Sequence, residues 1–363
     1  MVSGPLRVFY NASALPRQEA GAGVYTLELG RALAARESLR LDVFAPRDPG
    51  FGIWTGTPGG LTGRLAWEEF QLGRLASLRE ADVYHGPHFA TPRTNTPAVA
   101  TVHDLAFFRL PKRYDAAHRA YYGWLARSAK RARRLIVPSG AVAGDCVRYL
   151  GYPPERIRVV SEAPRAGLQP PGEAAVADFR RKHTIHGPYF ACLATAEPGK
   201  RAVDAIRAMS RILDHAPSAV LVLAGNPGPL STPLQREAER LGVAGAVRFP
   251  GYLPDEDLAP FLGGAVALLF PSLFEGFGLP PLEALACGTP VVTTAAPAMD
   301  EVLGDGALFV PLRDPVALAD AARSLLEPAR REDLAARGLE FVRRFSWERA
   351  ASETESVYRE AAS

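Results

Sequence analysis

Residues 271–286 of the chain read PSLFEGFGLPPLEALA. The apolar run Ala267–Phe270 just before them predicts a buried strand, and Pro280 and Pro281 pre-set φ for the first turn of a helix. A helix that begins directly after a strand and a tight turn directs its free amides and the positive end of its dipole to one place. The stretch therefore predicts a strand–turn–helix unit with an anion site at the turn.

The same alternation of short apolar runs and helical patterns extends over the whole chain, and it is typical of α/β proteins with parallel sheets. A first series of expected strands lies at 6–10, 41–45, 83–85, 98–102, 135–137 and 158–160, with a helix over 23–36. A second series lies at 189–193, 220–224, 247–249, 267–270, 290–293 and 307–310, followed by a last helix over 347–362. The predicted fold class is α/β, with two Rossmann-like, doubly wound domains that face a central cleft.

A stretch rich in proline, glycine and alanine, residues 163–175, is the expected linker between the two series. It divides the chain into an N-terminal domain over 1–165 and a C-terminal domain over 166–346. Residues 347–363 are expected to pack back on the N-terminal domain. A length of 363 residues suits two domains of ordinary size.

Charge is divided unevenly between the two parts, although the total of 42 Lys and Arg against 39 Asp and Glu is nearly balanced. Residues 1–165 hold 23 basic and 14 acidic side chains, a net charge of +9, and the rest holds 19 and 25, a net charge of −6. The total of +3 argues against a dedicated nucleic-acid-binding protein. Three distant cysteines and the absence of a long apolar run favour a cytoplasmic protein without a leader peptide.

Two carboxylates flank the predicted anion site: Glu275 precedes the turn, and Glu283 is expected in the first turn of the helix. A carboxylate beside a phosphate site is useful when it meets hydroxyl groups, so sugar hydroxyls are the expected ligands. The simpler alternative is a first-turn acid that favours the helix dipole, together with a solvated loop residue. The residues alone leave both alternatives open.

The whole segment resembles the Glu-x7-Glu motif of the family-4 retaining glycosyltransferases, including its Glu-Gly-Phe-Gly-Leu-Pro core and the Ala-Cys-Gly-Thr-Pro-Val-Val at 286–292. Other segments of the chain resemble further motifs of this family. Residues 21–25 resemble its glycine loop, 101–105 its His-Asp-Leu segment, 137–139 its interdomain strand end, 158–164 its approach to the linker, and 195–200 its Thr-x-Glu-Pro-Arg-Lys loop. The resemblance implies a GT-B fold, an acceptor-binding N-terminal domain, a nucleotide-sugar donor held mainly by the C-terminal domain, and retention of anomeric configuration. It implies neither a metal nor another cofactor.

By this resemblance, Lys200 would neutralise charge on the leaving diphosphate. Gly199 stands where the family commonly has arginine, and Arg201 is a candidate substitute. Glu275 would bind hydroxyls of the donor sugar, and Glu283 would bind the ribose hydroxyls. The turn and a second loop would meet sugar, phosphate and base, through Gly276, Phe277, Gly278, Leu279, Gly251, Tyr252 and Leu253. The alternatives are a solvated Lys200 and a Tyr252 that only packs.

The N-terminal domain carries the second set of expected site residues. The glycines that flank Ala22, Gly21 and Gly23, permit close backbone approach at a helix N-terminus on the phosphate and acceptor side. By resemblance, His103 contacts a hydroxyl of the donor sugar, with Asp104 beside it, and Ser139 ends the interdomain strand. A purely structural histidine is the alternative for His103.

Three other patterns are not taken as sites. Asp255-Glu256-Asp257 spells the metal signature of a different glycosyltransferase fold, but Asp255 is expected to be an ordinary helix N-cap. The pairs His85/His88 and His183/His186 have spacings usable for zinc, yet no further ligand accompanies them at motif spacing. The sequence contains no Gly-x4-Gly-Lys-Ser/Thr phosphate loop.

The excess positive charge is concentrated at Arg127–Arg134, with Lys112, Arg113 and Arg119 before it. A solvated helix face is the ordinary interpretation of such a run. The functional interpretation is contact with an anionic acceptor, or peripheral contact with the inner face of an anionic membrane.

Together these features predict a metal-independent, retaining hexosyltransferase that acts on a hydroxyl of a saccharide or lipid-linked acceptor in polysaccharide or glycolipid synthesis. The segments resemble the family's mannosyltransferase branch most, so the first choice of donor is GDP-mannose. No nucleic-acid partner is expected. A GT-B nucleotide-sugar epimerase and a non-catalytic subunit that binds sugar nucleotides or glycans are the alternatives.

Overall fold

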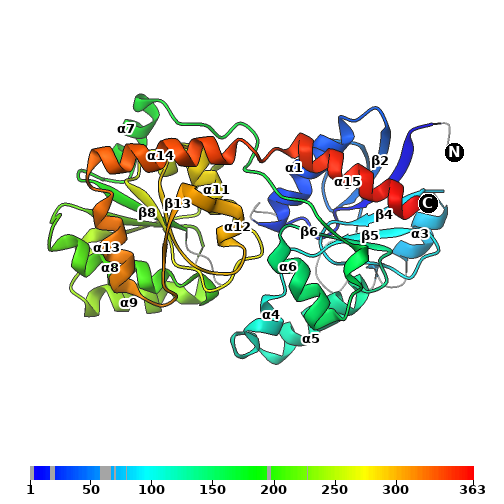
Figure 1. Cartoon of the computed structure of the whole chain (residues 1–363), viewed down its shortest axis with the longest axis horizontal. Helices are drawn as coiled ribbons and strands as arrows, with labels where there is room; N and C mark the ends of the chain where they lie inside the picture. The colour runs from blue at the N-terminus through cyan, green and yellow to red at the C-terminus, as the bar shows by residue number, and fades with distance from the viewer. Residues whose placement is uncertain are drawn as a thin grey trace. The chain divides into compact units, whose positions relative to one another are not determined.

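The computed structural model describes residues 4–16, 21–57, 67–68, 71–78, 80–193, 198–226 and 228–363. The chain forms two compact units, labelled by element in Figure 1. Unit 1 comprises Met1–Ala166 and Phe345–Ser363, and unit 2 comprises Gly167–Arg344. Each unit is built on a parallel sheet, which confirms the predicted fold class.

Unit 1 has a seven-stranded sheet in the order β3-β2-β1-β4-β5-β6-β7, with all neighbours parallel. Its strands are β1 Leu6–Asn11, β2 Leu39–Ala45, β3 Ile53–Gly56, β4 Val83–Gly86, β5 Ala98–Thr101, β6 Arg134–Val137 and β7 Ile157–Val159. Its α-helices are α1 Ala22–Ala34, α3 Leu72–Leu78, α4 Ala106–Arg109, α5 Ala116–Ala129, α6 Gly140–Asp145 and α15 Trp347–Ala362.

Both faces of this sheet are buried, as expected for parallel strands. Along β1, Val8 and Tyr10 join an apolar cluster with α1 and α15, whereas Phe9 points to the other side and stacks on Phe44. Helix α15 packs against α1 and β4 to β6. The buried His85 of β4 is bonded to α15 through the hydroxyl of Tyr358, 2.6 Å from Nδ1.

Unit 2 has a six-stranded parallel sheet in the order β10-β9-β8-β11-β12-β13. Its strands are β8 Tyr189–Leu193, β9 Val220–Ala224, β10 Val247–Gly251, β11 Ala267–Phe270, β12 Val291–Thr294 and β13 Ala307–Val310. Its α-helices are α7 Glu173–Lys182, α8 Ala202–Leu213, α9 Ser231–Arg240, α10 Asp255–Gly263, α11 Leu279–Ala286, α12 Met299–Leu303, α13 Pro315–Ser324 and α14 Pro328–Val342.

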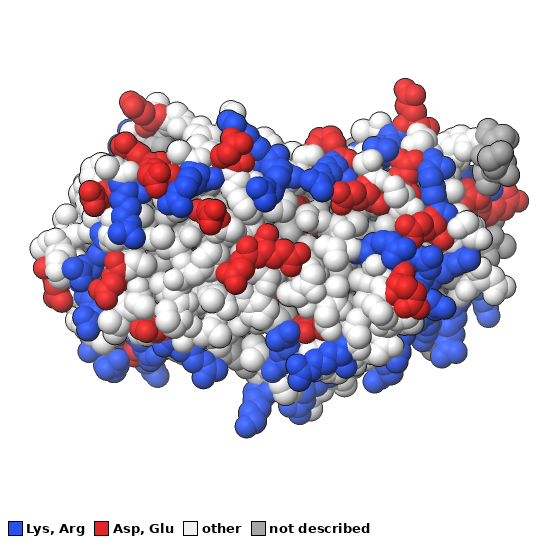
Figure 2. Space-filling model, in the orientation of Figure 1, with Lys and Arg blue, Asp and Glu red and all other residues white. Residues whose placement is uncertain are grey.

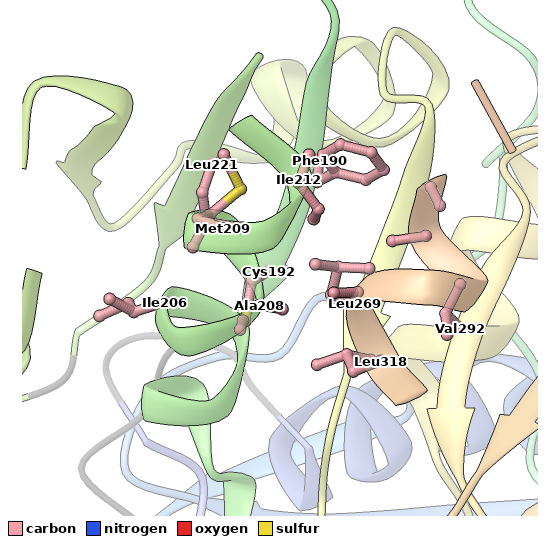
Figure 3. Packing of buried hydrophobic residues seen from close by; sticks show 14 of the residues in the cluster. Phe190, Cys192, Ile206, Ala208, Met209, Ile212, Leu221, Leu269, Val292 and Leu318 are labelled. Atoms are coloured by element: carbon pink, nitrogen blue, oxygen red, sulfur yellow. The ribbon is translucent and has the colours of Figure 1, made fainter. Parts of the chain in front are cut away.

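The core of unit 2 lies between α8, α13 and the sheet (Figure 3). Met209 and Ile212 of α8 are fully buried against Phe190 of β8 and Leu221 of β9. Leu318 of α13 completes the same cluster. This packing fixes β8 and β11 as neighbours at the centre of the sheet.

The structure differs from the sequence-based expectations at several elements. Strand β3 was not predicted, because Ile53 and Trp54 are exposed at the sheet edge and show no alternating burial. Helix α7 begins at Glu173, inside the expected linker, and the units divide after Ala166. Asp255 is the first residue of α10 and Pro254 is the N-cap, so the expected N-cap assignment was wrong by one residue.

The basic cluster Arg127–Arg134 does not form one helix face. Helix α5 ends at Ala129 and β6 begins at Arg134, so the cluster is divided between the end of the helix, the connecting turn and the start of the strand. In the part of the chain described here, we find no helix that is both long and apolar enough to cross a membrane.

We predict that Tyr358→Phe lowers the free energy of unfolding by about 1–3 kcal/mol, because it leaves Nδ1 of the buried His85 without its hydroxyl partner. Urea denaturation followed by circular dichroism measures the effect. Tyr252→Phe is the matched control, since Tyr252 is 42% exposed, and should unfold like the wild type. Equal midpoints for Tyr358→Phe and the wild type would contradict a structural role for this bond.

Candidate functional site

The strand order of unit 2 reverses direction between β8 and β11, which are neighbours although two strands separate them along the chain. Open α/β sheets bind ligands outside the carboxyl ends of strands at such a switch point. A 3-10 turn over Pro198–Lys200 comes shortly after β8, and residues 271–286 follow β11 directly. The two segments are joined by a backbone bond of 3.0 Å from Leu273 N to the carbonyl oxygen of Gly199.

This bond brings Lys200 and Glu275 together. Nζ of Lys200 lies 2.7 Å from Oε1 and 2.8 Å from Oε2 of Glu275. The side chains are only 21% and 9% exposed, respectively. Nζ also lies 5.5 Å from the ring centroid of Phe270, at the end of β11. From the sequence, Lys200 was expected to bind a diphosphate and Glu275 a sugar. In the structure these two side chains form an ion pair with each other.

The turn before α11 is built around Gly278, which has a φ of 104° and serves as the N-cap. A Cβ at this position would lie 2.6 Å from the terminal carbon of Met299, which can move aside, so it is the backbone conformation that requires glycine. Helix α11 begins at Leu279, as the sequence predicted within one residue, and Pro280 and Pro281 carry no N–H. Leu279 therefore supplies the first N–H of this helix, because the two residues after it have none.

Glu283 lies on α11 with 4% of its surface exposed. It is the fifth residue of the helix, so its expected place in the first turn was wrong by a short margin. Burial and the nearby charge of Glu283 raise the pKa of Cys287 to about 12. This thiol therefore stays protonated near neutral pH and does not supply a nucleophile.

Arg201 does not join the pair of Lys200 and Glu275. Its Nε and Nη2 lie 2.8 Å and 2.6 Å from the two carboxylate oxygens of Asp204, which is almost fully buried. A role for Arg201 at a phosphate would require this bidentate pair to break. Thr195, Ala196 and Glu197 of the expected Thr-x-Glu-Pro loop lie outside the described residues.

The second predicted donor loop leaves the carboxyl end of β10. Gly251 has a φ of 79° and its carbonyl accepts a 2.7 Å bond from Gly225 N, after β9. Tyr252 is an exposed large side chain, so the alternative of ordinary packing does not describe it. Leu253 beside it is half-buried.

In unit 1 the predicted glycine loop opens α1. Gly21 is the N-cap of the helix, with a φ of 51°, and its carbonyl accepts a bond from Tyr25 N. Ala22 is the first helical residue, and a Cβ on Gly23 would lie 3.0 Å from the ring of Pro16. The conformations agree with a need for glycine at these positions, independent of any ligand.

His103 follows β5 and is held at both ring nitrogens. Nδ1 lies 3.0 Å from Oε1 of Glu162, and Nε2 lies 2.8 Å from the carbonyl oxygen of Pro87. The ring packs edge-on against Tyr25 of α1, with centroids 4.6 Å apart. Burial alone would lower the pKa of His103, but the hydrogen bond and charge of Glu162, together with the bond to Pro87 and the charge of Asp104, raise it above the ordinary value.

Two of the predicted unit 1 residues hold local structure. Oδ1 of Asp104 accepts a 2.8 Å bond from Ala106 N at the start of α4. Ser139 is the N-cap of α6 and its hydroxyl accepts from Val142 N. Both side chains therefore have a structural role that is sufficient to explain them.

Among the described residues, no group of three His, Cys, Asp or Glu side chains could hold a metal ion. His85, from one of the zinc-like spacings, instead bonds two hydroxyls, those of Tyr358 and Thr101. Asp257, from the Asp-x-Asp pattern, pairs with Lys182.

Sequence reasoning did not select Glu162. It follows β7 and lies 59 residues from His103 along the chain. No spacing rule connects them; the only available signal was that both residues come shortly after strands of the same sheet, whose carboxyl ends share one edge.

Comparison with known proteins places both parts of the chain in one group of enzymes. Residues 176–340 match the family model described as glycosyl transferases group 1, and residues 20–163 match that of glycosyltransferase family 4. The O-antigen chain mannosyltransferase B of Escherichia coli is 32% identical over 282 residues, covering 76% of this chain and 74% of that protein. A D-inositol 3-phosphate glycosyltransferase of Acidothermus cellulolyticus is 30% identical, covering 94% and 86%.

Solved structures share the fold. The sucrose-phosphate synthase of Thermosynechococcus elongatus superposes with a TM-score of 0.80 at 22% identity, covering 98% of each chain. HepE of Anabaena, solved in complex with UDP-glucose, superposes with a TM-score of 0.77 at 18% identity, covering 97% of this chain and 99% of that one.

We predict that Glu275→Ala and Lys200→Ala change the affinity for a free nucleoside diphosphate in opposite directions. Removing Glu275 releases Lys200 from its counter-ion, so the diphosphate should bind several-fold more tightly. Removing Lys200 deletes a charge-assisted bond and should weaken binding about tenfold or more. Isothermal titration calorimetry with GDP and UDP measures both.

Lys182→Ala is the matched control, because Lys182 is also paired with an acid of unit 2, Asp257, and lies outside the switch point. Its affinity should equal that of the wild type. Weaker binding in Glu275→Ala would show that the ion pair does not compete with the diphosphate.

Proposed function

Because the chain belongs to glycosyltransferase family 4, we propose that it transfers a hexose from a nucleoside diphosphate sugar to a hydroxyl of a glycan or glycolipid acceptor. Members of this family retain the anomeric configuration and need no metal. The observation that carries this proposal is the buried pair of Lys200 and Glu275 at the switch point of unit 2. One group suits an anion and the other suits hydroxyls, which together describe the two ends of a sugar diphosphate.

The proposed chemistry is substitution on one face of the sugar. The bond between the anomeric carbon and the diphosphate oxygen breaks, and the acceptor oxygen bonds to the same carbon from the same side. The acceptor proton passes to the leaving diphosphate. Lys200 and the amides of Gly278 and Leu279 stabilise the negative charge that develops on the diphosphate, while Glu275 holds hydroxyls of the sugar.

Glu283 and the loop Gly251–Leu253 are proposed to bind the nucleoside. A buried carboxylate on α11 suits the paired hydroxyls of a ribose, as in dinucleotide sites. The exposed ring of Tyr252 offers a flat surface beside the carboxyl end of β10.

Mannose from GDP-mannose is the proposed donor sugar and nucleotide. The support is the identity with a protein named as an O-antigen chain mannosyltransferase. UDP-glucose, which is bound in the HepE structure, is the competing donor in the test below.

An anionic acceptor or membrane surface is the proposed partner of unit 1. Lys112, Arg119, Arg127 and Lys130 are exposed around α5. Figure 2 shows Lys and Arg gathered over the α4 and α5 part of this unit, with few acidic groups among them. Basic side chains near anionic lipid gain about 1 kcal/mol each, so a few are sufficient for peripheral contact.

We predict that the protein releases nucleoside diphosphate from GDP-mannose faster than from UDP-glucose or an ADP-sugar, with EDTA present, and only when an acceptor is added. A coupled assay over a panel of saccharide acceptors measures the rate. Glu275→Ala and Lys200→Ala should lower kcat/KM about a hundredfold or more, in the range expected for loss of one transition-state hydrogen bond. Isomerisation of the donor without acceptor would instead identify an epimerase, and strict dependence on added metal would contradict the mechanism.

We predict that the protein sediments with vesicles containing anionic phospholipid and not with purely zwitterionic vesicles, and that 0.5 M salt releases it through screening. Replacing Arg119, Arg127 and Lys130 by glutamine should abolish sedimentation. Arg240→Gln, a change of an exposed arginine in unit 2, is the control and should bind like the wild type. Equal binding of both variants would exclude this surface.

A further inference from the structure

The fully buried His85 and the largely buried His103, whose side chain is 13% exposed, are two histidines of unit 1 with contrasting partners. The nitrogens of His85 face the hydroxyls of Tyr358 and Thr101, each of which can either donate or accept. A neutral imidazole satisfies both, and burial, reinforced by the charge of His103, lowers the pKa of His85 to about 3. His85 is therefore uncharged at neutral pH.

The nitrogens of His103 face two groups that accept hydrogen bonds. Glu162 presents a carboxylate oxygen to Nδ1, and Pro87 presents a backbone carbonyl to Nε2. A neutral imidazole has a single N–H and can satisfy only one of them. Both bonds form together when the ring carries two protons, that is, as an imidazolium.

The surroundings of His103 agree with a positive charge. Glu162 and Asp104 supply negative charge, and Tyr25 of α1 contributes a ring edge. His88 lies with its ring centroid 5.9 Å away, and His85 is the neutral group just described. The carboxylate of Glu162 is the closest charged group and is itself only 5% exposed, so water does not screen it effectively.

We infer that Glu162 is a positioning residue that keeps His103 doubly protonated, so that His103 offers a charged N–H to the substrate and cannot act as a base. The substrate part of this inference rests on the proposed function. Since Nδ1 is committed to Glu162, Nε2–H is the group that can exchange the carbonyl of Pro87 for an oxygen of a substrate bound by unit 1. A doubly protonated His103 cannot take the proton of the acceptor hydroxyl. This agrees with the proposed reaction, in which that proton passes to the leaving diphosphate.

The test compares Glu162→Gln and Glu162→Asp with the wild type. Glutamine can still accept from Nδ1 but carries no charge, whereas aspartate keeps the charge on a shorter side chain. The matched control is Asp115→Asn, which removes the carboxylate of the exposed pair between Asp115 and His118, 2.8 Å apart. Histidine Cε1–H NMR signals are followed against pH, with His103 assigned through His103→Gln.

In the wild type we expect His103 to remain protonated at pH 7. In Glu162→Gln its pKa should fall to or below the ordinary value of about 6.5. The raised pKa means that the charged form is present at low pH and is lost as pH rises through the folded-state pKa. The kcat/KM of Glu162→Gln should therefore decline at lower pH than that of the wild type, and acid should restore it.

Glu162→Asp should behave like the wild type in the NMR titration, and Asp115→Asn should leave the signal of His103 and the kcat/KM profile unchanged. A His103 that is neutral at pH 7 in the wild type, or a midpoint that Glu162→Gln does not move, would overturn the inference. The NMR result needs no substrate, so it stands apart from a failure of the proposed function. If Glu162→Gln unfolds, the titration of the wild type and of Glu162→Asp still decides the matter.

Discussion

The ion pair between Lys200 and Glu275 is the interaction on which the rest of the candidate donor site depends. It joins the segment after β8 to the segment after β11. The same two segments are also joined by a backbone hydrogen bond from Leu273 N to the carbonyl oxygen of Gly199. Because both side chains are largely removed from water, each charge would be costly without the other. The free protein thus keeps two groups of opposite charge ready at one place, and a ligand with an anionic end and a hydroxyl-bearing end can replace both partners at once.

The order of strands explains why these residues meet. In each sheet the chain starts at a central strand, proceeds to one edge, and then returns to the strand beside its starting point. The loops at this reversal have no covering connection, so they are free to bear ligand groups. The buried core of α8 and α13 packs against β8 and β11, so the pair of Lys200 and Glu275 follows strands whose positions are fixed by that core.

Strong local patterns made much of the fold predictable from the sequence. The buried strands appeared as short runs of apolar residues, and the start of α11 followed from its glycine and prolines. Strand β3 was missed because it lies at an edge with exposed Ile53 and Trp54, and the N-cap of α10 was misplaced by one residue.

The sequence motif identified the candidate site residues of unit 2. It could not predict the bond between Lys200 and Glu275, because a motif specifies residues and not which of them contact one another. Glu162 was missed for a related reason, since its role depends on a histidine that follows another strand of the sheet.

The path of the chain through the two units has a consequence for how the protein is made. Unit 2 is one continuous segment, whereas unit 1 needs α15, which is synthesised after all of unit 2. Until then β4 to β6 and α1 lack the helix that covers them, and His85 lacks the hydroxyl of Tyr358. On the ribosome, the second unit in sequence is therefore the first that can be completed, and the apolar surface of the first stays open to chaperones for most of translation.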